Sequence, residues 1–260
     1  MRTKMIAGNW KMNTTLADAL VLAGGVRNAI EHIERIEVVL CPPTIWLTEI
    51  AHEIIPPNHL PHLKLGGQNL YFEPHGAFTG ETAPGMIAEV AEYVIIGHSE
   101  RTHIFGETPE LITKKIIAAL EVGLKPIVCI GEDERTDRSK TDLTHQLHAI
   151  LKDFSESDVE KLVVAYEPVW AISGGNAAHQ AADPEYANEV MGSLRTILPA
   201  KTRILYGGSA NDENCRGFLM TDHCDGLLVG GASLKLKNFN IMCQVADDTA
   251  GEQGHKSRHS

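Results

Sequence analysis

The chain has 260 residues, of which 43% are hydrophobic and 22% charged, a composition typical of a globular protein with a large core. Acidic residues outnumber basic ones by 34 to 23, which argues against a nucleic-acid partner because phosphates attract a basic surface. No apolar run approaches the roughly 20 residues of a membrane span, and the N-terminus lacks the apolar stretch of a signal peptide. Five scattered cysteines without a CxxC pair favour a reducing, cytoplasmic location.

Short apolar segments recur along the chain at intervals of a few tens of residues. They are rich in Val, Ile and Leu and show little polar alternation, which is typical of parallel strands buried on both faces. In chain order, these segments cover residues 5–10, 38–43, 63–69, 93–98, 125–132, 161–168, 203–209 and 226–233. We therefore predict eight parallel strands.

Helical segments separate these strands. Residues 17–36 carry an apolar stripe, and Thr82 is expected to cap a short helix after the third strand. Thr108 and Asp183 each precede a proline, the pattern of an N-cap followed by proline at the first helical position. Eight strands alternating with helices, without a change of composition, predict an α/β protein with one (β/α)8 barrel domain.

The barrel is expected to span residues 1–248. The alternative is an open, doubly wound sheet, and the lack of GxGxxG after the first strand argues against its dinucleotide-binding form. Residues 249–260 lack apolar anchors, so they are expected to form a disordered polar tail.

Polar and glycine residues follow several of the predicted strands. In a (β/α)8 barrel the chemistry takes place where the strands end. The residues at these ends are Asn9 and Lys11 after the first strand, His98 after the fourth, Glu167 after the sixth, and the glycine pairs 207–208 and 230–231 after the last two. Glycines let backbone amides approach an anion closely, so the last two loops predict a phosphate site.

Each of these residues alone also has a plain structural explanation. Glu167 could cap a helix or lie on the surface, His98 could cap the helix that begins at Ser99, and Lys11 could be a surface lysine. Their convergence at the same end of separate strands favours one shared site. The histidines at 52, 59 and 62 lack the spacing of zinc ligands, so no metal site is predicted.

The order and spacing of several motifs resemble the triosephosphate isomerase family from residue 7 to about residue 234. The matching motifs are GNWKMN (8–13), QN (68–69), GAFTGE (76–81), IIGHSER (95–101), VCIGE (128–132), AYEPVW (165–170), YGGS (206–209) and VGGASL (229–234). The resemblance implies interconversion of dihydroxyacetone phosphate and D-glyceraldehyde 3-phosphate through an enediolate. It implies no metal and no organic cofactor.

The resemblance also implies roles for individual residues. Glu167 would be the base, His98 a neutral imidazole that polarises the substrate, and Lys11 a positive charge beside the enediolate. The substrate and its phosphate would be held by Asn9, Lys11 and the amides near Ser173, Ser209, Gly230 and Gly231.

Two loops complete the expectation. Residues 168–178 would form a lid, whose tip at 173–176 departs from the family's usual Gly-Thr-Gly-Lys. The loop at 76–81 would reach into a neighbouring subunit of a homodimer and bury Phe78 there, the alternative being a loop folded back on its own subunit.

Two other functions are compatible with a barrel of this kind. The first is a phosphosugar enzyme that eliminates phosphate to form methylglyoxal, and the second is a non-catalytic barrel that binds a metabolite or a protein. The joint presence of Glu167, His98 and Lys11 argues against both.

Overall fold

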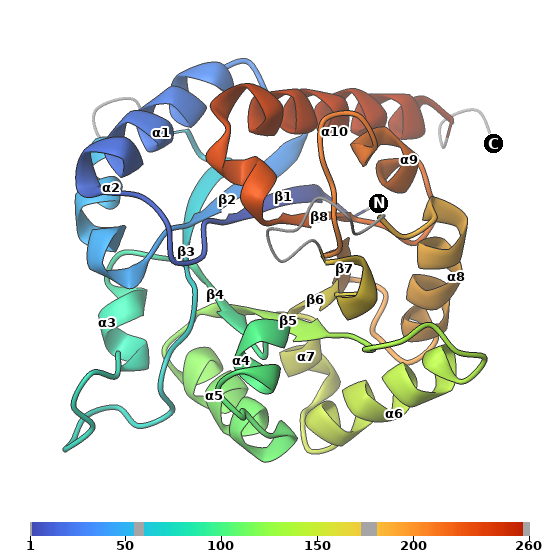
Figure 1. The fold of residues 1–260 in the computed structure, drawn as a ribbon, viewed down its shortest axis with the longest axis horizontal. Coiled ribbons are helices and arrows are strands. Elements are labelled where there is room, and N and C mark those ends of the chain that lie inside the picture. Colours follow the sequence, from blue (N-terminus) through green and yellow to red (C-terminus); the bar gives the residue numbers. More distant parts are fainter. Residues whose placement is uncertain (1, 55–59, 173–180, 257–260) are drawn as a thin grey trace.

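The computed structural model describes residues 2–54, 60–172 and 181–256, which form a closed barrel of eight parallel strands paired in sequence order (Figure 1). The predicted (β/α)8 fold is confirmed. The strands are β1 (Lys4–Asn9), β2 (Ile36–Cys41), β3 (Leu63–Gly67), β4 (Tyr93–Ile96), β5 (Lys125–Ile130), β6 (Val163–Tyr166), β7 (Arg203–Tyr206) and β8 (Gly226–Val229).

Alternate residues of the strands fill the inside of the barrel. Side chains two positions apart on a strand share a face, so each strand contributes one set inward and one set outward. The inner set forms its own buried cluster of Met5, Ala7, Val39, Cys41, Tyr93, Ile95, Ile127, Cys129, Val163, Ala165, Leu205 and Leu228. The outer set packs against the surrounding helices, which explains why the strands are apolar on both faces.

Helices surround the barrel on all sides (Figure 1). The α-helices are α1 (Leu16–Ala29), α2 (Leu47–Ile54), α3 (Pro84–Ala88), α4 (Ser99–His103), α5 (Pro109–Glu121), α6 (Ser139–Leu151), α7 (Glu156–Val159), α8 (Pro184–Arg195), α9 (Cys215–Leu219) and α10 (Leu236–Lys256). Three 3-10 turns lie at Thr44–Trp46, Val169–Ala171 and Gly231–Leu234. No helix in the part of the chain that the structure describes combines the length and apolar character needed to cross a membrane.

Two of the three predicted helix caps are confirmed. The Thr108 side chain accepts from the amide of Leu111 at 3.3 Å, and the Asp183 side chain accepts from that of Glu185 at 3.0 Å. The expected Thr82 cap is wrong, because α3 begins after Ala83 and has no side-chain cap.

The disordered polar tail was predicted to begin at residue 249, which is too early in the chain. Helix α10 continues to Lys256, so the expectation is wrong for residues 249–256, and residues 257–260 lie outside the described residues. Ala250 packs against the core, and polar contacts add to the hold on this end of the helix. Arg35 forms an ion pair with Asp247 at 2.7 Å, and Arg216 forms another with Glu252 at 2.7 Å. These polar anchors are invisible in a search for apolar periodicity.

Replacing Gly226 with alanine is expected to destabilise the closure of the barrel. Gly226 has a φ of +151° and pairs with Met5 where β8 meets β1, and a Cβ there would lie 1.8 Å from the Met5 carbonyl oxygen. Because that oxygen belongs to a strand backbone, no side-chain rotation relieves the clash. Gly226→Ala should lower the free energy of unfolding by about 3 kcal/mol or more, measured by urea denaturation.

Gly85→Ala is the matched control. Gly85 lies in α3, and a Cβ there would have no atom within 4 Å. We expect this variant to unfold at the same or a slightly higher urea concentration, because alanine favours a helix by about 0.5–1 kcal/mol over glycine. Equal urea midpoints for the two variants would show that the close approach at Gly226 does not constrain the barrel.

Candidate active site

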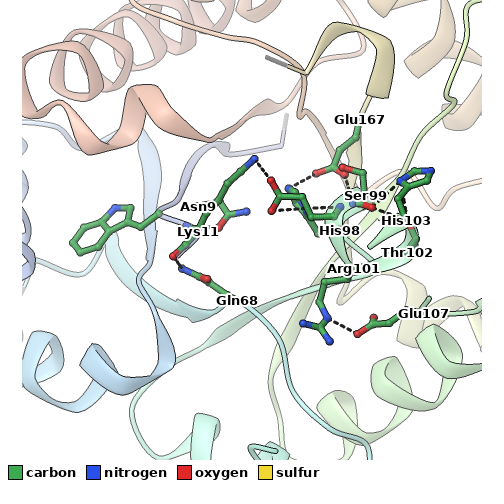
Figure 2. A network of polar contacts seen from close by, with 12 residues as sticks. Asn9, Lys11, Gln68, His98, Ser99, Arg101, Thr102, His103, Glu107 and Glu167 are labelled. Atoms are coloured by element: carbon green, nitrogen blue, oxygen red, sulfur yellow. Dashed lines mark hydrogen bonds and ion pairs between the residues drawn. The ribbon is translucent and has the colours of Figure 1, made fainter. Parts of the chain in front are cut away.

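The structure brings the predicted polar residues together at the carboxyl ends of the strands. They line a cavity of about 320 Å³ together with Ile172, residues 207–211, Leu228 and residues 230–232. Asn9, Lys11, His98 and Glu167 all belong to this lining and point toward a common region (Figure 2). Ser173 and the rest of the proposed lid tip lie outside the described residues.

Glu167 lies directly after β6 and is only 1% exposed. Its backbone amide donates to the Ile130 carbonyl at 2.7 Å, which extends the pairing with β5 by one residue and aims the side chain across the mouth of the barrel. Its Oε2 accepts from the Ser99 amide at 2.9 Å. Its Oε1 lies 3.2 Å from His98 Nε2 without hydrogen-bond geometry, and it has no hydrogen-bond partner among the described residues. One carboxylate oxygen is therefore available to accept a proton.

His98 occupies the N-cap of α4 and is 7% exposed. Its Nδ1 accepts from the Glu100 amide at 3.2 Å, so that nitrogen carries no proton. The proton of the neutral ring is then on Nε2, the nitrogen next to Glu167 (Figure 2). The plain explanation of His98 as a helix cap is correct, and the same hydrogen bond prepares the ring to donate into the cavity.

Lys11 is held in an uncommon backbone conformation. Its φ of +54° lies in the left-handed region, which costs free energy for any residue other than glycine. The Asn9 side chain accepts from the Lys11 amide at 3.0 Å, and the Gln68 side chain donates to the Lys11 carbonyl at 2.9 Å. The ammonium group forms an ion pair with Glu100 at 2.6 Å. Lys11 is therefore a fixed part of the site and not a free surface lysine.

The glycine-rich loops form the other side of the cavity. At Gly207 a Cβ would lie 2.9 Å from Glu167 Cγ, so this glycine leaves room for the Glu167 side chain. At Gly230 a Cβ would lie 3.4 Å from Lys11 Cε, which is an ordinary contact distance. A Cβ on Gly231 would meet open space. The Ser209 amide donates to the Ala171 carbonyl at 3.1 Å, so this predicted anion donor is engaged within the protein.

Sequence reasoning missed Glu132, which organises the residues beside Glu167. Its Oε1 accepts from Tyr166 at 2.8 Å, Trp170 at 3.1 Å and Tyr186 at 3.2 Å. Burial raises the pKa of Glu132, although the three hydrogen bonds oppose that shift. Glu132 thus fixes the end of β6 and the turn at Val169–Ala171, which lie on either side of Glu167.

Ser99, Glu100 and Gln68 were also given no role from the sequence. Ser99 and Glu100 lie in the IIGHSER motif and Gln68 lies in the QN motif. The motifs therefore include these residues but do not indicate what they contact. Their partners in the site are 57 to 89 positions away in the chain, and no local pattern identifies such pairs.

A larger cavity lies at the opposite end of the barrel. It has a volume of about 1040 Å³ and is lined by residues at the starts of strands. Its central polar groups satisfy one another, since Glu37 accepts from Tyr93 at 2.6 Å and from Arg203 at 2.7 Å. In (β/α)8 barrels the chemistry takes place at the carboxyl ends of the strands, so we assign it to the smaller cavity.

Comparisons with known proteins agree with this geometry. The sequence profile described as "Triosephosphate isomerase" matches residues 4–246. A triosephosphate isomerase of Dehalococcoides mccartyi is 43% identical over 95% of this chain and 97% of its own length, and one of Clostridium botulinum is 43% identical over 92% and 98%. The crystal structure of triosephosphate isomerase from Bartonella henselae superposes with a TM-score of 0.81 at 32% identity, over 94% of this chain and 98% of that one.

The raised pKa of Glu132 predicts a pH-dependent effect on stability. In the folded protein this carboxyl keeps its proton to a higher pH than in the unfolded chain, so its contribution to stability falls as pH rises above 4.5, the ordinary pKa of a glutamate. Glu132→Gln removes that dependence and keeps an oxygen acceptor. We expect the stability of Glu132→Gln relative to wild type, measured by urea denaturation, to rise from pH 4.5 to pH 7. A relative stability that falls over this range would contradict the assignment.

Proposed function

The chain belongs to the triosephosphate isomerase family, and we propose that Glu167, His98 and Lys11 carry out its chemistry. The reaction is the interconversion of dihydroxyacetone phosphate and D-glyceraldehyde 3-phosphate, an isomerisation of glycolysis. One observation gives the strongest support to the proposed roles. The buried Glu167 carboxylate has an oxygen that lies 3.2 Å from His98 Nε2, in the same cavity as Lys11, and no described residue donates a hydrogen bond to it.

Glu167 takes a proton from the substrate carbon next to the carbonyl and returns it to the neighbouring carbon. Between these transfers the substrate is an enediolate, and its negative charge must be stabilised. A positioned general base contributes about 10²–10⁴-fold to the rate, and preorganised electrostatic stabilisation usually contributes more. The Nε2–H of His98 donates to the substrate oxygens, and the ammonium of Lys11 provides the opposite charge.

The phosphate group is assigned to the glycine-rich side of the cavity. Gly230 and Gly231 lack side chains there, so their backbone can approach the phosphate closely. Binding through the Ser209 amide requires it to exchange the Ala171 carbonyl for a phosphate oxygen, since it is hydrogen-bonded in this structure. Asn9, whose side chain holds Lys11, supports the substrate end of the site. The family resemblance adds Ser173, which is outside the described residues.

The two competing functions are less well supported. A non-catalytic barrel has no need for a buried carboxylate beside an imidazole and a strained lysine. Deliberate elimination of phosphate is disfavoured because the same three side chains are those that an enediolate isomerase requires. No metal ion or organic cofactor enters the proposed chemistry, and we propose a cytoplasmic location from the scattered cysteines.

We also propose a homodimer formed through the loop at residues 76–81. Phe78 is 40% exposed and packs on Tyr71 of its own chain with ring centroids 4.7 Å apart. Beside the catalytic cavity lies a second cavity of about 440 Å³, lined by Lys11, Gln68, Glu100 and Phe105 among others. Large apolar side chains are exposed around it, and apolar surface of this kind favours burial by a partner. If the loop of one subunit entered this cavity of another, it would bury both Phe78 and the apolar side chains around the cavity.

Glu167→Asp tests the role of the base. Aspartate keeps the charge but withdraws the carboxylate by one methylene group, and a displacement of about 1 Å can cost on the order of 10²-fold in rate. We expect kcat to fall at least that far, measured with glyceraldehyde 3-phosphate in a coupled assay, with a circular dichroism spectrum like that of wild type. Wild-type kcat in this variant would rule out Glu167 as the base.

Phe78→Asp tests the dimer interface. We expect wild type to elute at twice the mass of one chain in size-exclusion chromatography with light scattering, and the variant to shift toward the monomer because a charge cannot be buried at the contact. Val21→Asp is the control, since Val21 is 75% exposed on α1, outside the proposed contact, and should leave the mass unchanged. A wild-type monomer would contradict the proposal.

A further inference from the structure

We propose that His103, held by Asp133, positions the imidazole of His98 through the peptide bond between Ser99 and Glu100. His103 is a positioning residue, because it reaches the reacting groups only through this peptide. The kinetic consequences rest on the role proposed above for His98. The structural consequence, a fixed proton position on the His98 ring, does not depend on that role.

The peptide bond between Ser99 and Glu100 carries hydrogen bonds on both sides. Its N–H, that of Glu100, donates to His98 Nδ1 at 3.2 Å. Its carbonyl, that of Ser99, accepts from Thr102 Oγ1 at 3.0 Å and from His103 Nδ1 at 2.7 Å (Figure 2). A peptide group is planar and rigid, so any rotation that moves the carbonyl also moves the N–H. The side chains that hold the carbonyl therefore orient the donor to His98.

A close contact with a carboxylate holds His103 against another part of the barrel. Its Nε2 lies 2.8 Å from Asp133 Oδ1, in the loop between β5 and α6. Helix α4 has only five residues, too few for a helix to be stable through its own hydrogen bonds. Asp133 directly follows Glu132, which holds the residues on either side of Glu167. The contact thus places the base and the imidazole relative to the same loop.

The geometry places a proton on one ring nitrogen of His103. Nδ1 lies 2.7 Å from the Ser99 carbonyl oxygen, which can only accept, so Nδ1 carries the proton of this hydrogen bond. Nε2 lies 2.8 Å from Asp133 Oδ1 without hydrogen-bond geometry, and this contact restrains the position of the ring. The donor on the Ser99 carbonyl polarises the peptide and strengthens the Glu100 N–H as a donor. This favours the His98 tautomer with Nδ1 as acceptor and the proton on Nε2.

This role differs from simple stabilisation. The His103 and Asp133 side chains are 48% and 69% exposed, and ion pairs at such exposure contribute little to stability. Their effect should therefore appear in the orientation of the Ser99–Glu100 peptide more than in the free energy of unfolding. Thr102 supplies a second donor to the same carbonyl, so loss of His103 should weaken the arrangement without abolishing it.

Kinetics of variants provide the first test. We expect His103→Ala to lower kcat about 3- to 10-fold, as for loss of one hydrogen bond, with KM changed by less than about twofold. His103→Gln retains an N–H donor and should recover most of kcat. Asp142→Asn is the control, because Asp142 forms a comparably exposed ion pair with Arg138 on α6. An equal loss in Asp142→Asn would overturn the proposal, and so would wild-type kcat in His103→Ala if the His98 and Glu100 resonances also stay as in wild type.

Nuclear magnetic resonance provides a second test that requires no turnover. In ¹⁵N-labelled wild type, His98 Nδ1 should show the resonance of an unprotonated ring nitrogen, identified by its loss in His98→Gln. His103→Ala should move this resonance and shift the Glu100 amide proton upfield, and Asp142→Asn should move neither. If both resonances stay in place in His103→Ala, the proposal fails even if kcat has fallen. If they move while kcat does not, the catalytic role of His98 fails instead.

Discussion

Closure of the sheet is the constraint on which the site depends. Strand β8 pairs with β1 as well as with β7, so the strands form a ring and their carboxyl ends share one mouth. Asn9 at the end of β1, His98 after β4 and Glu167 after β6, separated by up to 158 positions, thereby line the same cavity. Without the pairing at Gly226 and Met5, an open sheet would spread these ends along an edge.

Because the mouth of the barrel is buried, its local hydrogen bonds determine how Glu167 and His98 are placed. A carboxylate that is 1% exposed has lost its hydration, and among the described residues the Ser99 amide replaces part of it. The two peptide groups flanking Ser99 act on both partners, since one donates to Glu167 and the other to His98. The relative placement of base and imidazole is therefore set by the backbone of α4, whose own support comes from side chains outside the cavity.

The site also contains a strained backbone and buried polar atoms without hydrogen bonds to the described residues, which is typical of functional sites. Lys11 adopts a left-handed conformation that its neighbours must hold, and Glu132 and Glu167 each have a buried oxygen without a hydrogen-bond partner among the described residues. These features lower stability locally. The barrel offsets that cost through the apolar cluster inside it and the larger one between strands and helices.

The sequence by itself determined the eight strands, the barrel and the identity of the residues at the strand ends. Apolar runs, proline caps and strand-end polar residues are local patterns, and local patterns follow from backbone geometry and burial. Only the tertiary structure decided that Glu100 pairs with Lys11, that Glu132 holds Tyr166 and Trp170, that His103 reaches Ser99 and Asp133, and that α10 extends past residue 249. Most of these contacts are made by polar side chains from distant segments. Their energies depend on direction and distance in space, which the spacing of residues along the chain does not record.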